Sequence, residues 1–427
     1  MLDLRRIREE PESVVRGLSR RGEDFGPVVH EIVRLDAERR DGLTAVNDLK
    51  AERNTASKEI GERKRAGEEA DDLIGAMRTL GDRISELDAA VAAAEERIDL
   101  LMLELPNVPL DEVPEGGEEA NRVVGTWGAP AEFGFTPRPH WELGEALGIL
   151  DLPRGARISG SGFPVLRAGG ARLQRGIINY CLDRHVSRNG YEELRVPYLV
   201  TRETLTGTGQ LPKFADESYL SDRDDLWLIP TAEVPLTNLH RDEILEGADL
   251  PVRYTSATPC FRREAGAAGR DTRGLLRVHQ FDKVELVRYE TPERSREALE
   301  ELTREAEELL EAFGLHYRRL LLAGGDLGFS AAMTYDLEVW SPGVEQWLEV
   351  SSCSVFTDFQ ARRANLRFRP APGEKPAFVH TLNGSALALP RIVAALLETH
   401  QTVDGSVDVP DVLHSYLGFT RLEPTGG

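Results

Sequence analysis

The residues best suited to chemistry lie in segment 261–285, which concentrates basic side chains in an acidic chain. Its sequence, FRREAGAAGRDTRGLLRVHQFDKVE, holds five arginines, one lysine and three glycines, whereas the whole chain has a formal net charge of −21. Apolar alternation at both ends predicts two strands, and the glycine-rich stretch between them predicts a long hairpin loop. Because arginine on a strand beside a loop is a rigid fork for phosphate or carboxylate, the segment predicts an anion site.

The alternative is a solvated hairpin whose arginines are neutralised within the segment itself. Glu264, Asp271, Asp282 and Glu285 supply carboxylates for such pairs. Basic clusters paired in this way are common on ordinary protein surfaces. The segment alone therefore leaves both interpretations open.

Length and composition restrict the class of protein. The 427 residues, 41% hydrophobic and 29% charged, predict a folded globular protein of two or three domains. An excess of 73 acidic over 52 basic residues argues against general nucleic-acid binding but permits a local basic patch. Three scattered cysteines offer no disulfide framework, and the chain shows neither a signal peptide nor a membrane-spanning apolar run. These features predict a cytoplasmic location.

The elements around these residues begin with an N-terminal helical hairpin. Apolar residues alternate in steps of four and three over 73–105, and less regularly over 28–60, which is the pattern of two heptad seams. Only residues 64–70 separate them, so the two helices are predicted to pack antiparallel. At 1.5 Å per residue each helix reaches roughly 50 Å.

Two functions are open for such an arm. A dimerisation or spacer coiled coil is the simpler one. Residues 50–65, however, hold six basic against three acidic side chains near the tip. A basic tip suits a phosphate backbone, and an RNA duplex in particular, because duplex RNA is recognised by shape and backbone.

The rest of the chain alternates helical and strand-like patterns that carry further polar residues. A helix is predicted over 171–190, followed by a strand over 191–200 in which Pro197 requires an edge position. A strand is also predicted over 344–356, and a glycine-containing turn running into a helix over 380–401. Neither GxxxxGK[ST] nor GxGxxG occurs, which disfavours P-loop and Rossmann enzymes. The residues with chemical potential in these segments are Thr231 and Glu233 at a helix start, Glu349, Ser351 and Ser352 on the 344–356 strand, and Ser385 and Arg391 in the first turns of the last helix.

Each of these residues has a simple structural explanation, such as a helix cap or a solvated charge. Together they supply arginines for phosphates, a carboxylate for Mg²⁺, an aromatic ring for a base and small polar groups for a second substrate. The set therefore predicts nucleotide chemistry.

The motifs resemble those of one family. TPCFRREAGAAGRDTRGLLRVHQFDKVEL resembles motif 2 of the class II aminoacyl-tRNA synthetases in its bacterial seryl-tRNA synthetase form. The stretch 169–200 is similar to motif 1, and TLNGSALALPR is similar to motif 3. TGTGQLPKF, TAEVP and EVSSCS resemble further family segments. The resemblance covers essentially the whole chain and implies an α+β protein, with a coiled-coil tRNA-binding domain at 1–107 and a catalytic domain at 108–427 that has an antiparallel sheet flanked by helices.

The resemblance also implies roles for matching residues. Arg262 would hold the ATP α-phosphate and the serine carboxylate, and Arg277 and Arg391 would hold the outer phosphates. Phe281 would stack under the adenine, and Glu264 would take the adenine or ribose side. The implied catalytic residues are Arg262, Arg277 and Arg391; the implied ATP contacts are Arg262, Arg263, Glu264, Arg277, Val278, Phe281, Glu349, Val350, Ser351, Ser352 and Arg391; the implied serine contacts are Thr231, Ala232, Glu233, Arg262, Glu285, Asn383 and Ser385; and Glu349 and Ser352 would bind Mg²⁺ together with ATP.

The implied activity is ATP-dependent activation of L-serine to seryl adenylate, followed by transfer of serine to the 3′ end of tRNA(Ser), with tRNA(Sec) as a second candidate acceptor. The serine carboxylate is already ionised at neutral pH, so no general base is needed. The resemblance further implies a homodimer that contacts no membrane, with the 171–190 helix and the Pro197 strand at its interface.

Three competing functions remain at this stage. A ligase that charges a carrier protein would have no use for the basic-tipped arm. A non-catalytic scaffold would not need the arginines and carboxylates of the motifs. A synthetase for threonine, proline or glycine would carry a C-terminal anticodon-binding domain, and only 36 residues follow Arg391.

Overall fold

The chain forms two compact units in a computed structural model that describes residues 1–264 and 273–425. The arm unit comprises Leu2–Ser19 and Glu23–Pro106, and the sheet unit comprises Met1, Arg20–Gly22 and Asn107–Gly427. Within the described ranges, no helix combines the length and apolar character needed to span a bilayer.

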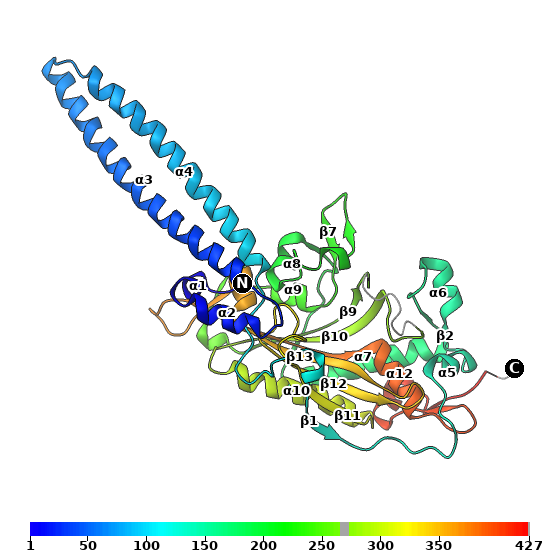
Figure 1. Cartoon of the computed structure of the whole chain (residues 1–427). Helices are drawn as coiled ribbons and strands as arrows, with labels where there is room; N and C mark the ends of the chain where they lie inside the picture. Colours follow the sequence, from blue (N-terminus) through cyan, green and yellow to red (C-terminus); the bar gives the residue numbers. More distant parts are fainter. Residues whose placement is uncertain (265–272, 426–427) are drawn as a thin grey trace. The chain divides into compact units, whose positions relative to one another are not determined.

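The arm unit consists of four helices, of which two form the predicted antiparallel hairpin (Figure 1). The heptad seam is buried at Ile84, Val91 and Ile98, as expected. Gly42 lies on the opposing seam, where a Cβ would come within 2.8 Å of Val91 Cγ2, so glycine permits close helix packing at this point. The helices are α1 (Leu4–Glu9), α2 (Pro11–Ser19), α3 (Gly26–Ala66) and α4 (Asp71–Glu104).

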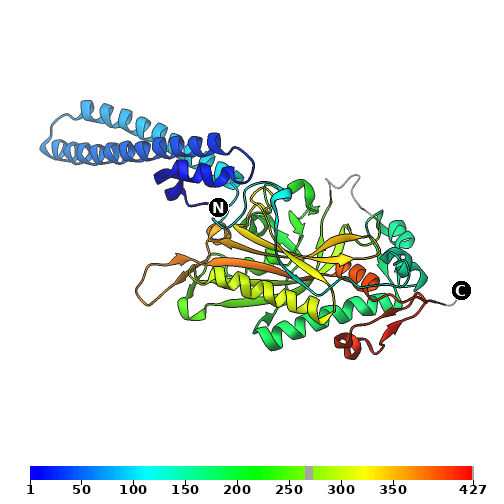
Figure 2. The ribbon, with the colours of Figure 1, turned by 60° about the horizontal axis from the view of Figure 1, so that its bottom comes forward.

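The sheet unit is built on an eight-stranded sheet, and all neighbouring strands are antiparallel except the pair β4 and β9. Helices α7, α10 and α12 pack against this sheet (Figure 2) and share one hydrophobic core with it. In spatial order the strands are β1 (Arg122–Trp127), β11 (Tyr317–Leu321), β12 (Met333–Ser341), β13 (Gln346–Thr357), β16 (His380–Ala388), β10 (Gln280–Glu290), β9 (Val252–Phe261) and β4 (Glu192–Glu193); the helices are α7 (Ala168–Asn189), α10 (Ser295–Ala312) and α12 (Leu389–Thr399).

Shorter elements surround this sheet. The remaining helices are η1 (Glu118–Ala120), α5 (His140–Ala146), α6 (Leu152–Ser159), α8 (Arg202–Thr208), η2 (Ala215–Glu217), α9 (Glu233–Thr237), η3 (Gly247–Asp249), α11 (Phe359–Ala364), η4 (Asp411–Leu413) and α13 (His414–Leu417); the remaining strands are β2 (Leu150–Asp151), β3 (Val165–Leu166), β5 (Leu199–Thr201), β6 (Leu220–Ser221), β7 (Leu226–Leu228), β8 (Ile244–Glu246), β14 (Arg367–Arg369), β15 (Ala377–Phe378), β17 (Val407–Asp408) and β18 (Arg421–Leu422).

The strand predicted over 191–200 is wrong as a single element. The structure divides it into β4 at the edge of the large sheet and β5 in a separate three-stranded sheet. Pro197 lies between them and belongs to neither strand. Because proline has no N–H to donate to a ladder, this position favours the break.

The turn predicted around Gly384 is also wrong. Gly384 and Ser385 lie within strand β16, and α12 begins only at Leu389. A Cβ on Gly384 would lie 2.2 Å from Leu302 Cδ2 and 3.2 Å from Cys353 Sγ. Glycine at this position is explained by tight packing against α10, and Ser385 is consequently placed by a strand register and not by a helix terminus.

Replacing Gly384 by alanine is predicted to lower the stability of the sheet unit by about 1–3 kcal/mol, because the added methyl group overpacks the core. Differential scanning calorimetry measures this loss of stability as a lower unfolding temperature. Gly134→Ala is the matched control, since nothing lies within 4 Å of its Cβ position. An equal effect of both substitutions would contradict the packing explanation.

Candidate active site

A polar cleft of about 750 Å³ lies over the face of the sheet opposite the core. Side chains alternate between the two faces of a strand, and in β16 Leu382 and Ala386 are buried in the core whereas Asn383 and Ser385 line the cleft. The same alternation exposes polar residues of the neighbouring strands. These are Lys283 of β10, Ser352 and Ser354 of β13, and Thr334 and Asp336 of β12.

Most residues proposed from the sequence meet in this cleft. Three do not line it: Arg263 is exposed, Ala232 is fully buried, and Glu285 is buried beneath two lining residues that it contacts, Thr231 and Lys283. Those that do line it are Thr231, Glu233, Arg262, Glu264, Arg277, Val278, Phe281, Glu349, Val350, Ser351, Ser352, Asn383, Ser385 and Arg391.

The segment 261–285 forms one wall of the cleft. β9 ends at Phe261 and β10 begins at Gln280, so neither strand extends as far toward the loop as predicted. The Arg262 backbone N–H donates to the His279 carbonyl over 2.9 Å, which joins the two ends of the hairpin. The Arg262 guanidinium lies 5.3 Å from the centre of the Phe281 ring.

One arginine of this segment is paired with a carboxylate of the same segment. Arg277 Nη1 lies 3.1 Å from Glu264 Oε2. Within the described ranges Arg262 forms no ion pair, so its charge remains available for an anion. Most of the glycine-rich loop predicted between the two strands, residues 265–272, lies outside the described residues.

Arg391 enters the cleft from the first turn of α12. Its Nη1 donates to the Glu349 carbonyl over 2.7 Å and lies 3.5 Å from Glu349 Oε2. Its Nε donates to the Leu276 carbonyl over 3.3 Å. The guanidinium is therefore held between β13 and the segment that returns toward β10.

Glu285 is a fully buried carboxylate beneath the residues that form the floor of the cleft. Its Oε2 accepts a hydrogen bond from Thr231 Oγ1 over 2.9 Å and contacts the Lys283 ammonium. Its Oε1 is buried without any hydrogen-bond partner. Register places Ser385 directly opposite on β16. A buried acceptor without a donor costs free energy, so this floor favours a ligand that brings a hydroxyl or N–H group.

Glu233 is a second buried carboxyl group in the same region. Gln360 Nε2 donates to one carboxyl oxygen over 2.6 Å, and Asn383 Nδ2 donates to the other over 2.7 Å. Burial, reinforced by the nearby charge of Glu285, raises the pKa of Glu233 to about 7. Gln360 is itself fixed by Thr381 Oγ1, which donates to its Oε1 over 2.7 Å.

The residues proposed for Mg²⁺ have a third oxygen donor beside them. Asp336 lies opposite Ser352 in the β12–β13 pair. Burial, together with the charge of Glu349, raises the pKa of Asp336 well above its usual range, and its Oδ1 has no hydrogen-bond partner. Two carboxylates and a hydroxyl are the oxygen ligands that Mg²⁺ takes in proteins, so these residues fit the cation.

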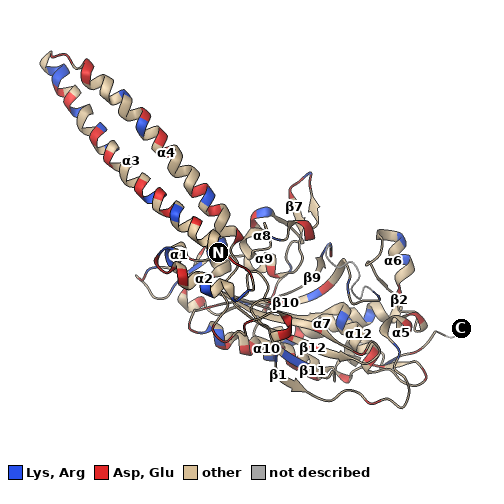
Figure 3. Cartoon of the chain, viewed as in Figure 1, with Lys and Arg blue, Asp and Glu red and all other residues tan. Residues whose placement is uncertain are grey.

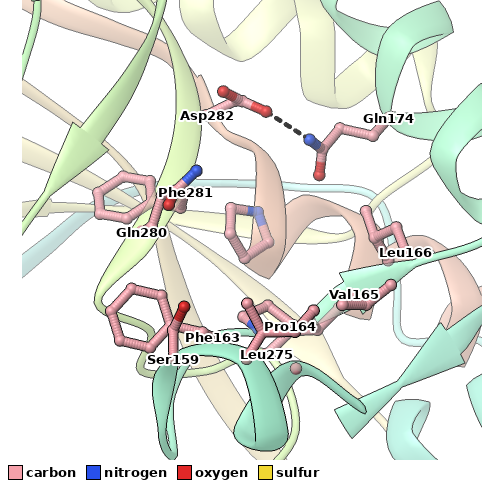
Figure 4. A pocket seen from close by; sticks show the side chains of 13 residues that line it. Ser159, Phe163, Pro164, Val165, Leu166, Gln174, Leu275, Gln280, Phe281 and Asp282 are labelled. Atoms are coloured by element: carbon pink, nitrogen blue, oxygen red, sulfur yellow. Dashed lines mark hydrogen bonds between the residues drawn. The ribbon is translucent and has the colours of Figure 1, made fainter.

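A second cavity of about 280 Å³ adjoins the cleft (Figure 4). Leu275, Phe281 and Pro390 line both spaces. On the far side of this cavity, Gln174 Nε2 donates to Asp282 Oδ2 over 2.6 Å. Phe281 therefore borders both spaces, and the strand that carries it is hydrogen-bonded to α7.

Comparisons with known proteins agree with this geometry. The seryl-tRNA synthetase N-terminal domain matches residues 1–109, and the class II tRNA synthetase core domain (G, H, P, S and T) matches residues 215–400. A serine–tRNA ligase of Gemmatimonas aurantiaca is 55% identical over 99% of this chain and 100% of its own length. One from Moorella thermoacetica is 57% identical over 99% of both. The chain belongs to the seryl-tRNA synthetase family.

Solved structures of this family have the same architecture. Seryl-tRNA synthetase from Pyrococcus horikoshii complexed with ATP is 42% identical, with a TM-score of 0.95 over 100% of both chains. The cytoplasmic serine–tRNA ligase of Naegleria fowleri in complex with AMP is 27% identical, with a TM-score of 0.90 over 100% of this chain and 99% of its own. The arm and the antiparallel catalytic sheet of a class II synthetase, both expected from the sequence, are thus confirmed.

Sequence reasoning missed three polar residues of this site. Lys283 lies two residues before Glu285 on β10, so the period of two along that strand was a usable signal. Asp336 lies on β12 opposite Ser352, and only the pairing of β12 with β13 brings it to the site. Gln360 lies on α11 and reaches Glu233 through tertiary packing, for which the local sequence has no signal.

Proposed function

We propose that this chain activates L-serine with ATP to form seryl adenylate and then transfers serine to the 3′ end of tRNA(Ser). The observation that carries the proposal is the buried, unpartnered Oε1 of Glu285 opposite Ser385 in a cleft that also holds Arg262 and Arg391. Such a floor selects an amino acid with a small side-chain hydroxyl. The guanidinium groups above it suit a carboxylate and a triphosphate.

In the first step, a carboxylate oxygen of serine attacks the α-phosphorus of ATP, and the bond from that phosphorus to the oxygen bridging to the β-phosphate breaks. Pyrophosphate leaves with the electron pair. Arg262 holds the carboxylate and the α-phosphate together and cancels charge that develops between them. Arg277 and Arg391 hold the outer phosphates, and Phe281 stacks on the adenine.

In the second step, the terminal ribose hydroxyl of tRNA attacks the activated carbonyl, and AMP leaves.

Glu349 and Ser352 are the proposed Mg²⁺ ligands, and the cation supplies neutralisation of phosphate charge when it is bound with ATP. The two similar structures described as complexes with ATP and with AMP support a nucleotide site in this cleft. The further proposed nucleotide contacts are Arg263, Glu264, Val278, Val350 and Ser351.

Serine recognition is proposed to use both buried carboxyl groups. Glu233, already held by two amide donors, receives the α-ammonium group. Glu285 accepts a hydrogen bond from the serine hydroxyl, and Ser385 contacts the same group. Alanine would leave the floor unsatisfied, and polar pockets discriminate strongly against such analogues. Thr231, Ala232 and Asn383 complete the proposed pocket.

The arm is proposed to bind tRNA, with residues 1–107 as the tRNA-binding domain and residues 108–427 as the catalytic domain. Basic and acidic side chains are interspersed along α3 and α4 (Figure 3). Near the tip, Lys50 pairs with Asp88 and Arg63 pairs with Glu59. Among the described residues, no ion pair engages the other basic side chains of this stretch, which leaves them for phosphates. These are Arg53, Lys58, Lys64 and Arg65.

Assembly and location are also proposed. A homodimer would use α7 and the segment around Pro197, in line with the family resemblance of this region to motif 1. A cytoplasmic location agrees with three cysteines that are buried as free thiols.

The direct test of the function is amino-acid-dependent exchange of pyrophosphate into ATP. Serine is expected to support exchange, and serine-specific tRNA is expected to accept serine. Glu285→Gln should lower kcat/KM for serine by about 10- to 100-fold, because a charged hydrogen-bond acceptor is lost. Ser354→Ala, which removes a cleft hydroxyl that is hydrogen-bonded to Thr334, is the control. Exchange driven by threonine or alanine but not by serine would contradict the assignment.

The raised pKa of Glu233 predicts a pH dependence for serine binding. Above pH 7 the carboxylate is ionised and binds the ammonium group, so KM for serine is flat. Below pH 7 it protonates, and KM rises by about tenfold per pH unit. Glu233→Gln should raise KM at pH 8 and abolish the slope, whereas Glu290→Gln, at another buried carboxyl with a raised pKa, should preserve it. A flat wild-type profile between pH 5.5 and 8 would refute the role of Glu233.

Neutralising the arm tip is predicted to separate the two half-reactions. A variant with Lys58, Lys64 and Arg65 all changed to glutamine should raise KM for tRNA by about tenfold or more and weaken its salt dependence, because phosphate contacts are lost. Pyrophosphate exchange should remain unchanged. Arg34→Gln, at an arginine paired with Glu38 on the same helix, is the control. Equal losses in exchange and charging would mean that the arm has only a structural role.

A further inference from the structure

A buried histidine and glutamate lie directly behind the segment that returns from the motif 2 loop. His140 and Glu398 are both fully buried, and neither belongs to the motifs considered above. His140 Nδ1 lies 2.7 Å from Glu398 Oε1. On the other side of the ring, the Leu275 backbone N–H donates to His140 Nε2 over 2.9 Å. The pair therefore connects α12 through α5 to the wall of the cleft.

The hydrogen bonds determine the protonation of both groups. Besides the imidazole, Glu398 accepts from Ser341 Oγ at 2.5 Å and from the backbone N–H groups of His140, Gly343 and Val344 at 2.8, 2.8 and 3.2 Å. Although burial alone would raise it, these donors hold the pKa of Glu398 below its usual value. Glu398 is thus an anion that only accepts, so His140 Nδ1 carries a proton. Its Nε2 accepts from Leu275, which makes the ring neutral and fixes its tautomer.

The backbone beside this contact is shaped to reach the ring. Gly274 has a positive φ of 74°, and a Cβ there would lie 2.2 Å from His140 Nε2. Only glycine permits this approach without a clash. Next to it, the Arg273 guanidinium lies 4.8 Å from the centre of the Trp141 ring. The return segment, residues 273–278, is therefore held at its start by consecutive residues of α5.

The segment that is hydrogen-bonded to His140 continues into the part of the cleft proposed to bind ATP. Leu275 and Leu276 line the cleft, and the Leu276 carbonyl accepts from Arg391 Nε. Arg277 follows and pairs with Glu264. A shift of the Leu275 backbone would displace both the carbonyl that orients Arg391 and the attachment point of Arg277. The serine floor is reached through other elements: Thr231 precedes α9, and Glu285 and Ser385 lie on β10 and β16.

We propose that His140 and Glu398 are positioning residues that clamp the return segment of motif 2 and thereby orient Arg277 and Arg391 for ATP. His140 acts through Nε2, which accepts the hydrogen bond from the Leu275 N–H. Glu398 acts by holding the proton of the imidazole on Nδ1, which leaves Nε2 free to accept. This inference rests on the proposed roles of the two arginines. The clamp itself is a structural property that is measurable without any activity.

Two substitutions at position 140 separate the clamp from simple packing. In His140→Gln the amide reaches the region of Nε2 and retains an acceptor for the Leu275 N–H. In His140→Asn the shorter amide occupies the region of Nδ1, so it still donates to Glu398 but leaves Leu275 without a partner. Ser341→Ala is the matched control, because it removes one donor to Glu398 and leaves the imidazole contact in place.

The experiment measures KM for ATP and for serine in pyrophosphate exchange, together with trypsin cleavage after Arg273 and Arg277 in the full chain. His140→Asn is expected to raise KM for ATP by about 10- to 100-fold, since small misplacements of binding groups have effects of that size. KM for serine should change by less than about threefold, and cleavage should accelerate. His140→Gln and Ser341→Ala should behave like wild type in both assays.

Two results would overturn the clamp. One is His140→Asn with wild-type KM for ATP and wild-type cleavage. The other is equal impairment of both substrates by His140→Asn and His140→Gln together with a lower unfolding temperature, which would indicate a purely structural histidine. If the wild-type chain shows no serine-dependent exchange, the proposed function fails, and the cleavage rates still decide whether the clamp exists.

Discussion

The register of β10 against β16 is the constraint on which the rest of the sheet unit depends. It sets Glu285 opposite Ser385 on the polar face of the sheet and packs Leu286 and Leu382 into the core on the other. Because side chains alternate with a period of two, a slip of one residue would bury the polar set in the core and expose the apolar set. The hydrophobic core and the polar cleft are two faces of the same pairing, so the force that folds the sheet also positions the site.

The cleft is assembled from groups that are incompletely satisfied without ligands. Glu285 and Asp336 each retain a buried oxygen without a donor, and Glu233 has a raised pKa. Arg262 lacks a carboxylate partner among the described residues. Each of these features costs some stability in the free protein, and each would be relieved by a ligand that brings an ammonium, a hydroxyl, a cation or a phosphate. Without ligands these groups could also be satisfied by pairing with one another. The rigid sheet beneath them limits such a rearrangement.

Local patterns predicted much of this architecture. The heptad seams specified the helical hairpin because a coiled coil is encoded by nearby residues. The charge pattern of the arginine-rich segment is also local, and it predicted an anion site. Pro197 and Gly384 were misinterpreted, since their roles depend on a strand break and on contact with α10. Two further residues could not be identified from the sequence for the same reason. Gln360 and His140 act through partners more than one hundred residues away in sequence.

The selectivity proposed for serine depends on the buried, unpartnered carboxylate oxygen of Glu285, which accepts a hydrogen bond from the hydroxyl of the bound amino acid. Titration calorimetry with non-hydrolysable sulfamoyl analogues of seryl and alanyl adenylate tests it most directly, because binding is measured without turnover. The account predicts that the alanyl analogue binds at least about 100-fold more weakly to the wild-type protein, since it leaves the acceptor unsatisfied. It also predicts that Glu285→Gln removes most of that difference. Binding of the two analogues within about threefold of each other would contradict the account.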